Sequence, residues 1–273
     1  RDRSRRRGSD IAMANLRLSL AELKRACADP RWRSGLVAGR RPPVRSAGVS
    51  SGGRPVGVLF RDGIAALQER LLDPAAPRAM PTTTWPALWG EMHRSWAGQV
   101  LDELVGANRL AAAAHLAEAW RRWCAEAVGW RVGQGPRLDW RRVFPRHEFT
   151  FDAVPLGVGA ATVDVEGPLA CVRRAAGRRL DLCDWRGEKA SDPKEDLLDL
   201  AIEWRILKGA RPDEAPVLSV EYFLPDREVV IVSGDELGAI VSERLDPVLA
   251  ELAALPGAAV GAGAGGSPGG GEA

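Results

Sequence analysis

The sequence predicts an α+β fold with an α/β core, and three observations carry this prediction. Apolar side chains recur every three or four residues over 58–72, 85–105 and 108–128, the spacing of helices that bury one face. From Phe144 onward the period changes, and alternating or β-branched residues are separated by Gly and Pro, as in strands joined by turns. A further helix then interrupts the strands. We therefore expect an N-terminal helical region followed by a core in the order βββαββα.

The N-terminal region also contains a shorter helix and a loop. Ser19 is a favourable N-cap for a helix that runs to Cys27. Asp29-Pro30 should end this helix, because a residue before proline disfavours helical backbone. Residues 35–53 are rich in Arg, Pro, Ser and Gly and predict a loop.

The second half of the chain supplies the strands of the predicted core. A meander of three strands is expected at residues 148–154, 161–172 and 179–185. The segment 194–208 is predicted to be a helix, because its apolar residues recur on one side and Asp192-Pro193 precedes it. Two more strands and a closing helix complete the order, at residues 217–224, 228–232 and 235–255.

Composition divides the chain into four parts. Residues 1–15 are expected to be an extension or a disordered segment, because the first patterned residues come after Met13-Ala14-Asn15. Residues 257–273 are rich in Gly and Ala, lack the large apolar side chains that offset ordering entropy, and predict a disordered tail. Between these ends we expect a helical N-terminal part over 16–142 and the core over 143–256.

Composition also limits the class of protein. The 273-residue chain is 45% hydrophobic, enough for a sizeable core, and its apolar stretches end well before the roughly 20 residues that cross a bilayer. We therefore expect a cytoplasmic protein with no membrane partner. A net charge of +2 gives no global argument for nucleic acid, but arginines are dense in residues 1–7 and 31–45. Four separated cysteines without a C-x-x-C pair predict no zinc site, disulfide framework or iron–sulfur cluster.

A hairpin-like segment, residues 167–172 and 180–186, carries the most informative charges. Side chains two apart on a strand project to the same side, so Asp184 and Arg186 are expected to face together. A carboxylate and a guanidinium in that arrangement can share one phosphate. The alternative is a surface ion pair at a strand end, which contributes less than about 1 kcal/mol.

Several short motifs follow one another along the chain. They are Ser-Leu-Ala-Glu-Leu at 19–23 before Cys-Ala-Asp-Pro at 27–30, Gly-Val-Leu-Phe-Arg at 57–61, Gly-Pro-Leu-Ala at 167–170, Asp-Trp-Arg-Gly at 184–187, and a helix with Asp199 and Glu203. In this order, over residues 16–255, the chain resembles the RecB-type nuclease domain of the PD-(D/E)XK superfamily. The resemblance implies a central mixed β-sheet flanked by helices.

The resemblance also implies a metal site. Active members of the family hold a divalent metal, Mg²⁺ or Mn²⁺, with two or three carboxylates. Asp184 matches one of these ligands and is the expected catalytic carboxylate, with Glu148 or Asp164 as its partner in metal binding. Ala170 stands where the family has another metal-binding aspartate, and a methyl group cannot ligate a metal.

The basic residues of the motifs differ from the family as well. Arg186 takes the place of the catalytic lysine, and it keeps phosphate affinity but is a poor base because its pKa is above about 12. Lys189 is the other candidate for the catalytic cation, although its odd offset points it to the opposite face of a regular strand. Arg61, where the family often has histidine, and Arg186 are expected to contact DNA.

These replacements predict a pseudo-nuclease. It would be a DNA-binding, catalytically impaired protein of DNA repair or defence, with DNA and a helicase or other repair or defence subunit as partners. Two alternatives stay open. One is an active Mg²⁺- or Mn²⁺-dependent DNA exo- or endonuclease with a rearranged site, and the other is a non-catalytic protein-interaction scaffold.

Other patterns have simpler interpretations. Asp199 and Glu203 form a solvated helix face unless a metal or an arginine lies between them, because like charges repel at this spacing. His147 and Glu148 lie at the start of the first strand, where only one of two adjacent side chains can face the site. Helically spaced tryptophans are expected in the core rather than stacked on bases: Trp85, Trp89 and Trp96.

Overall fold

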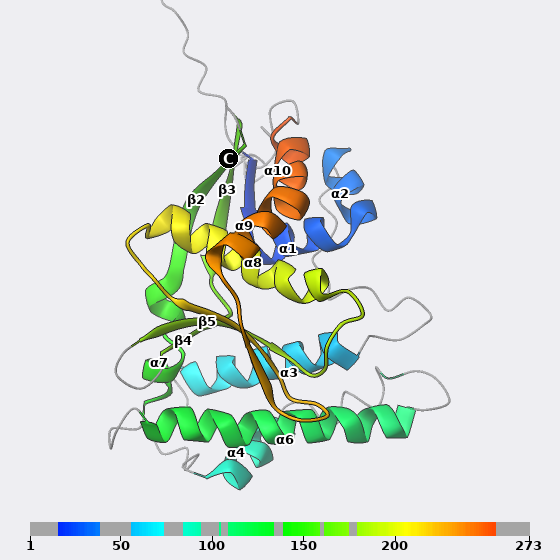
Figure 1. Ribbon diagram of the computed structural model, residues 1–273, viewed down its shortest axis with the longest axis vertical. Coiled ribbons are helices and arrows are strands. Elements are labelled where there is room, and N and C mark those ends of the chain that lie inside the picture. Colours follow the sequence, from blue (N-terminus) through cyan, green and yellow to red (C-terminus); the bar gives the residue numbers. More distant parts are fainter. Residues whose placement is uncertain are drawn as a thin grey trace, which may run out of the picture.

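The structure is an α+β protein, which confirms the predicted class (Figure 1). In this computed structural model the described residues are 16–38, 56–73, 84–93, 104, 109–133, 139–158, 161–174 and 179–254. The expected extension at 1–15 and the expected tail at 257–273 lie outside these ranges, and so does Trp96.

Helices dominate the first half of the chain. The elements are β1 (Leu16–Ser19), α1 (Leu20–Ala28), α2 (Pro30–Val37), α3 (Val56–Leu72), α4 (Trp85–Met92), α6 (Arg109–Gly133) and α7 (Trp140–Val143). Ser19 caps α1 as predicted, in a capping box with Glu22. Asp29 ends α1 and caps α2 at once, because its carboxylate accepts from the N–H groups of Arg31 and Trp32. Residues 35–37, expected to start a loop, belong to α2, and residues 39–53 of that expected loop lie outside the described ranges.

Strands and helices alternate in the second half. After a 3₁₀ turn (Arg146–Phe149) the elements are β2 (Thr150–Val158), β3 (Ala161–Pro168), β4 (Val172–Arg174), β5 (Leu180–Arg186), α8 (Pro193–Ala210), β6 (Val217–Tyr222), β7 (Glu228–Ile231), α9 (Gly234–Ile240), a π-helical turn (Val241–Leu245) and α10 (Asp246–Ala253). The strand expected over 161–172 is split in two. The chain turns from Gly167, whose φ of 116° is open to glycine and strained for other residues.

The strands form two mixed sheets. In the first, β3 lies between β1 and β2 and is parallel to β1 and antiparallel to β2. The second has the order β4-β5-β6-β7, with β5 and β6 parallel and both outer pairs antiparallel. Helix α8 makes the crossover between the parallel strands β5 and β6. The sequence does not reveal β1, because its four residues are held by pairing with a strand much later in the chain.

Strand β5 separates two hydrophobic cores. Leu180 and Leu182 pack into the first core, which includes α1, α8, α9, α10 and the first sheet. Cys183 and Trp185 pack on the other side with α3, α4 and α6. In Figure 1 the second sheet is accordingly seen between α8 above and α3 and α6 below. Because both faces of β5 are covered, only its last residue, Arg186, is not buried.

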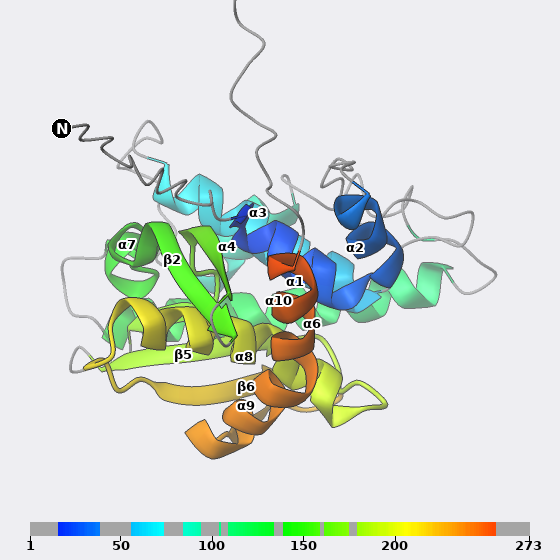
Figure 2. The same ribbon diagram turned by 90° about the horizontal axis from the view of Figure 1, so that it is seen from above.

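The first core draws on both ends of the described chain. Figures 1 and 2 place α10 beside α1 and α2, and Arg33 of α2 forms an ion pair with Glu251 of α10 at 2.8 Å. Side chains of β1 and α1 thus share a core with the strands of the predicted 143–256 part. The division of the chain at residue 142 stays a prediction.

The second core is aromatic. Trp120 of α6 donates its indole N–H to the Phe60 carbonyl of α3 at 3.0 Å, and Gly63 leaves room for the same indole ring. Trp89 packs against this core, as predicted, while the side chain of Trp85 is not described. No helix in the described ranges is both long enough and apolar enough to cross a membrane.

Candidate functional site

A cavity of about 220 Å³ lies between α1, α3, β5 and α8, next to the turn that joins β3 to β4. Its lining residues are Lys24, Arg61, Asp62, Ile64, Ala65, Gln68, Ala170, Cys171, Asp184, Trp185 and Asp199. Three residues that the sequence motifs single out, Arg61, Ala170 and Asp184, therefore meet at one place. The antiparallel pairing of β4 with β5 brings the two segments together, and just beyond it the Cys183 N–H donates to the Cys171 carbonyl at 2.7 Å.

Asp184 and Arg186 face together, as the strand geometry predicts. Arg186 Nε donates to Asp184 Oδ2 at 2.7 Å. The pair is not the surface ion pair of the alternative interpretation, because the Arg186 side chain is only 13% exposed and Asp184 is buried. Arg186 also lies 3.5 Å from Asp196 and 3.6 Å from Asp199, and it donates to the Asp196 carbonyl at 3.0 Å. One guanidinium thus serves three carboxylates.

Two further cations complete the buried cluster. Arg61 of α3 forms an ion pair with Asp199 of α8. Lys24 of α1 donates to Glu203 Oε1 at 2.6 Å, and the Cys171 N–H donates to the other oxygen of Glu203 at 2.8 Å. Glu203 has 0% exposure, so Asp199 and Glu203 are not a solvated helix face. Basic side chains from other elements relieve their repulsion.

Helix α8 presents its acidic residues at one regular spacing. Asp196, Asp199 and Glu203 are three and then four residues apart, which places them on one face of the helix. Asp196 Oδ2 accepts from the Tyr222 hydroxyl and the Ala190 N–H, each at 2.9 Å. Burial and this bond to Asp196 raise the pKa of Tyr222. The N-cap Asp192 and Pro193 fix the start of α8 and hence the phase of this acidic face.

The charges in the cluster alter one another's pKa values. Burial raises the pKa of Asp184, although Arg186, Arg61 and Lys24 oppose the shift. Burial would also raise the pKa of Asp199, but the three cations around it hold that pKa below its usual range. The pKa values of Lys24 and Arg186 are raised, because the facing carboxylates outweigh the effect of burial on each cation. Lys24 and Arg186 therefore stay protonated at neutral pH.

The other predicted site residues lie elsewhere. Glu148 precedes β2, is 40% exposed and forms an ion pair with Arg174. Asp164 lies in the middle of the first sheet, paired in register with Arg17 of β1. Lys189 is 56% exposed and binds Glu228 at 2.7 Å. None of them lines the cavity, so the expected ligand sets of Asp184 with Glu148 or Asp164 are not assembled.

The described ranges contain no group of three His, Cys, Asp or Glu side chains that could hold a metal ion. The four acidic residues of the cluster, Asp184, Asp196, Asp199 and Glu203, are instead bonded to cations. Arg61 and Arg186, the predicted DNA contacts, are both engaged by carboxylates. A phosphate would have to displace these carboxylates to bind either guanidinium.

A second buried network lies at the other face of β5. Arg173 of β4 forms ion pairs with Asp181 at 2.9 Å and Glu221 at 2.8 Å, and its guanidinium lies 4.4 Å from the Trp130 ring centre. Facing carboxylates raise the pKa of Arg173 against the opposing effect of burial. This network joins the three strands β4, β5 and β6 and has a structural role.

Sequence reasoning missed Lys24 and Asp196. The spacing of Asp196 from Asp199 and Glu203 was a usable signal for the acidic face of α8. Nothing in the sequence pairs Lys24 with Glu203, which are brought together only by packing of α1 on α8. A scan against protein-family models finds no family that matches this chain, and a search of curated proteins finds no similar sequence.

Proposed function

We propose that this chain is a non-catalytic, nucleic-acid-binding domain of the PD-(D/E)XK nuclease type. In it, Lys24, Arg61 and Arg186 take the place of a catalytic metal. The buried ion cluster is the observation that carries this proposal. A cytoplasmic location and a helicase or other repair or defence subunit as partner belong to the same proposal.

Topology supports the resemblance on which the proposal depends. The motif segment 167–170 covers the end of β3 and the turn before β4, and the segment 184–187 begins in β5, the antiparallel neighbour of β4. Ala170 and Asp184 line one cavity. The helix with Asp199 and Glu203 follows β5 directly and returns the chain to a parallel strand. Arg61 and Asp184, more than 100 positions apart in the sequence, thus line the same cavity.

The residues present do not fit a divalent metal. Mg²⁺ and Mn²⁺ require oxygen ligands free to approach the ion closely. In the described part of the chain the cluster has four carboxylates, Asp184, Asp196, Asp199 and Glu203, and three cations bonded to them. A metal would have to displace the guanidinium groups of Arg61 and Arg186, and Ala170 offers it no ligand. Arg186 cannot act as a base, because its pKa is raised above its already high value.

Nucleic-acid binding would use other arginines than the engaged pair. Arg141, Arg142 and Arg146 lie within six residues of one another around α7, and none of them forms an ion pair in the described part of the chain. Such side chains can bind phosphates and release counterions, so affinity should fall with salt. This region, rather than Arg61 and Arg186, supports the proposed contact with DNA.

The test combines binding and cleavage. We expect purified protein to bind fluorescently labelled single- or double-stranded DNA with an affinity that falls steeply from low to high salt. We expect no cleavage with Mn²⁺ or Mg²⁺. An Asp184→Asn variant is compared with Asp226→Asn, a matched change at an exposed carboxylate. Metal-dependent cleavage lost in Asp184→Asn but kept in Asp226→Asn would refute the non-catalytic assignment, and salt-independent binding would refute the nucleic-acid assignment.

One observation favours a second candidate, a protein-interaction scaffold. Strand β7 is an edge of the second sheet, and its consecutive apolar residues Val229, Val230 and Ile231 are all exposed. An open edge with apolar side chains is suited to adding a strand, such as β7 of a second copy. Light scattering over a range of concentrations tests this. Self-association abolished by Ile231→Lys supports the candidate, and a monomer at every concentration rejects it.

A further inference from the structure

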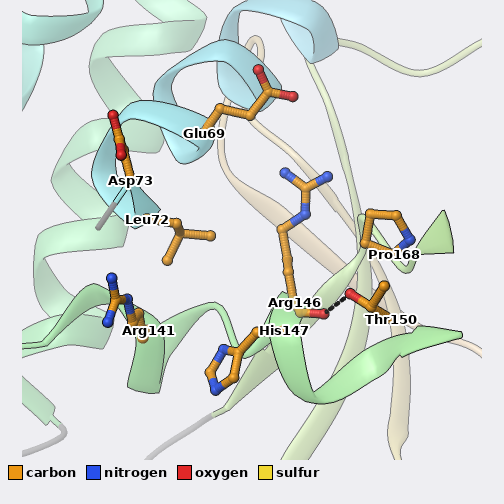
Figure 3. A pocket seen from close by; sticks show the side chains of 8 residues that line it. All are labelled: Glu69, Leu72, Asp73, Arg141, Arg146, His147, Thr150 and Pro168. Carbon is orange, nitrogen blue, oxygen red and sulfur yellow. Dashed lines mark hydrogen bonds between the residues drawn. The ribbon is translucent and has the colours of Figure 1, made fainter. Parts of the chain in front are cut away.

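A second and larger cavity, of about 570 Å³, lies where the C-terminal end of α3 approaches α7 and the start of β2. Figure 3 shows its lining side chains: Glu69, Leu72, Asp73, Arg141, Arg146, His147, Thr150 and Pro168. The cavity has the size of a small-molecule site. None of its residues belongs to the ion cluster described above.

We propose that this cavity binds a nucleoside monophosphate, either as a free nucleotide or as the terminal nucleotide of a strand. Two guanidinium groups and an imidazole surround the space in Figure 3, and no acidic group in the described ranges forms an ion pair with Arg141 or Arg146. The Nε of Arg146 is buried and has no hydrogen-bond partner. A buried donor without a partner is unfavourable, and a phosphate oxygen would satisfy it.

The protein holds Arg146 in place independently of any ligand. The Thr150 hydroxyl donates to the Arg146 carbonyl at 2.8 Å, across the junction of the 3₁₀ turn and β2 (Figure 3). On the other side, Asp139 caps α7 by accepting from the Arg141 N–H at 2.9 Å. The backbones that carry the two arginines are thus fixed, which lowers the entropy lost on binding an anion.

The remaining lining residues favour a nucleoside over a bare phosphate. Glu69 and Asp73 lie on the α3 side of the cavity, where they repel an isolated anion but accept hydrogen bonds from a sugar hydroxyl or a base amine. Leu72 and Pro168 provide apolar surface for a base. A ligand with one anionic end, a flat apolar body and hydrogen-bond donors meets all three requirements.

The two cavities are neighbours along α3 and β3. Gln68 lines the first and Leu72 the second, one helical turn or about 6 Å further along α3. On the strand side, Pro168 lines the second cavity and Ala170 the first. Nucleotide binding itself does not depend on the function proposed for the ion cluster.

Calorimetry with adenosine monophosphate, adenosine and inorganic phosphate tests the inference on the full chain. We expect the monophosphate to bind more tightly than either fragment. Arg146→Gln should weaken its binding about tenfold or more, since the variant loses a charge-assisted contact. Arg109→Gln is the matched control, because Arg109 is exposed at the start of α6 and does not line the cavity, and we expect affinity within about twofold of the wild type.

Two oligonucleotides then separate the sources of the ligand. If a single strand with a 5′- or 3′-terminal phosphate binds more tightly than the same strand without it, and Arg146→Gln removes the difference, the site takes a strand end. If the terminal phosphate makes no difference while adenosine monophosphate binds, the site takes a free nucleotide. The proposal is overturned if neither probe binds at millimolar concentration, or if both Arg146→Gln and Arg141→Gln bind as tightly as the wild type.

Discussion

Replacing Arg186 by Met tests whether the ion cluster holds the protein together. Methionine keeps an unbranched side chain of similar length but removes the guanidinium. Arg186 has its closest contact at 2.7 Å with the buried Asp184 and lies within 3.6 Å of two more carboxylates. Removing one partner of a buried ion pair costs about 3–5 kcal/mol, because the remaining charge is left without compensation. We expect Arg186→Met to lower the free energy of unfolding by about this amount.

A double-mutant cycle identifies the cause. In Asp184→Asn/Arg186→Met the buried carboxylate is neutral, so we expect the double variant to be about 1–3 kcal/mol more stable than Arg186→Met alone. Lys189→Met is the control, because the exposed pair of Lys189 and Glu228 should contribute less than about 1 kcal/mol. Urea unfolding followed by tryptophan fluorescence measures these three variants and the single variant Asp184→Asn, which completes the cycle. Equal losses for Lys189→Met and Arg186→Met, or additive losses in the cycle, would refute the reasoning.

Three further predictions concern packing, capping and pH. Gly63→Ala should lower the free energy of unfolding by about 1–3 kcal/mol, because its Cβ would lie 2.5 Å from the Trp120 ring. In the control Gly57→Ala the added Cβ meets no atom within 4 Å, and the variant should stabilise α3 by up to about 1 kcal/mol. Urea unfolding measures both variants. Ser19→Ala removes the capping box of α1 and should lower the free energy of unfolding by about 1 kcal/mol. A lower melting temperature would show this loss. Burial raises the pKa of Asp184 in the folded state above the ordinary 3.8, so the free energy of unfolding should fall as the pH rises above that value and Asp184 ionises. Asp184→Asn should therefore gain stability relative to the wild type over the same rise in pH. Urea unfolding at several pH values measures this difference.

Local patterns of the sequence predict most of the fold. Helical spacing predicts α3, α6 and α8, and strand alternation predicts that Asp184 and Arg186 face together. What local patterns do not predict depends on distant contacts. The four residues of β1 are ordered by β3, and the turn after Gly167 splits one expected strand into two. Asp29-Pro30 ends one helix and starts the next, because the same carboxylate that follows α1 caps α2.

The candidate site was only partly predictable for the same reason. Ala170, Asp184 and Arg61, which belong to the sequence motifs, line one cavity, and Arg186 lies beside Asp184 as the strand geometry predicts. The sequence could not show that basic side chains already occupy this space. Lys24 lies on the first helix and reaches α8, so its role depends on how the two helices pack. Charge composition alone cannot distinguish such a buried cation from one on the surface.

The ion cluster also determines how a metal site could be introduced. Ala170→Asp alone would add a carboxylate to a cluster in which the described carboxylates already outnumber the cations bonded to them. We therefore expect this variant to lose stability, by about 1–3 kcal/mol, through like-charge repulsion in a partly buried site. In Ala170→Asp/Arg186→Lys the added carboxylate stands beside a smaller and more mobile cation, which leaves room for a metal.

Melting curves with Mn²⁺ and with chelator separate these effects. We expect Mn²⁺ to raise the melting temperature of Ala170→Asp/Arg186→Lys and to leave the wild type unchanged, because a ligand stabilises only a fold that binds it. Calorimetric titration with Mn²⁺ should show uptake in the double variant alone. If the double variant takes up no metal while it remains folded, Ala170 does not stand at a metal-ligand position and the alignment with the nuclease motifs is wrong. If the wild type takes up Mn²⁺ at the cluster, the three cations do not replace the metal.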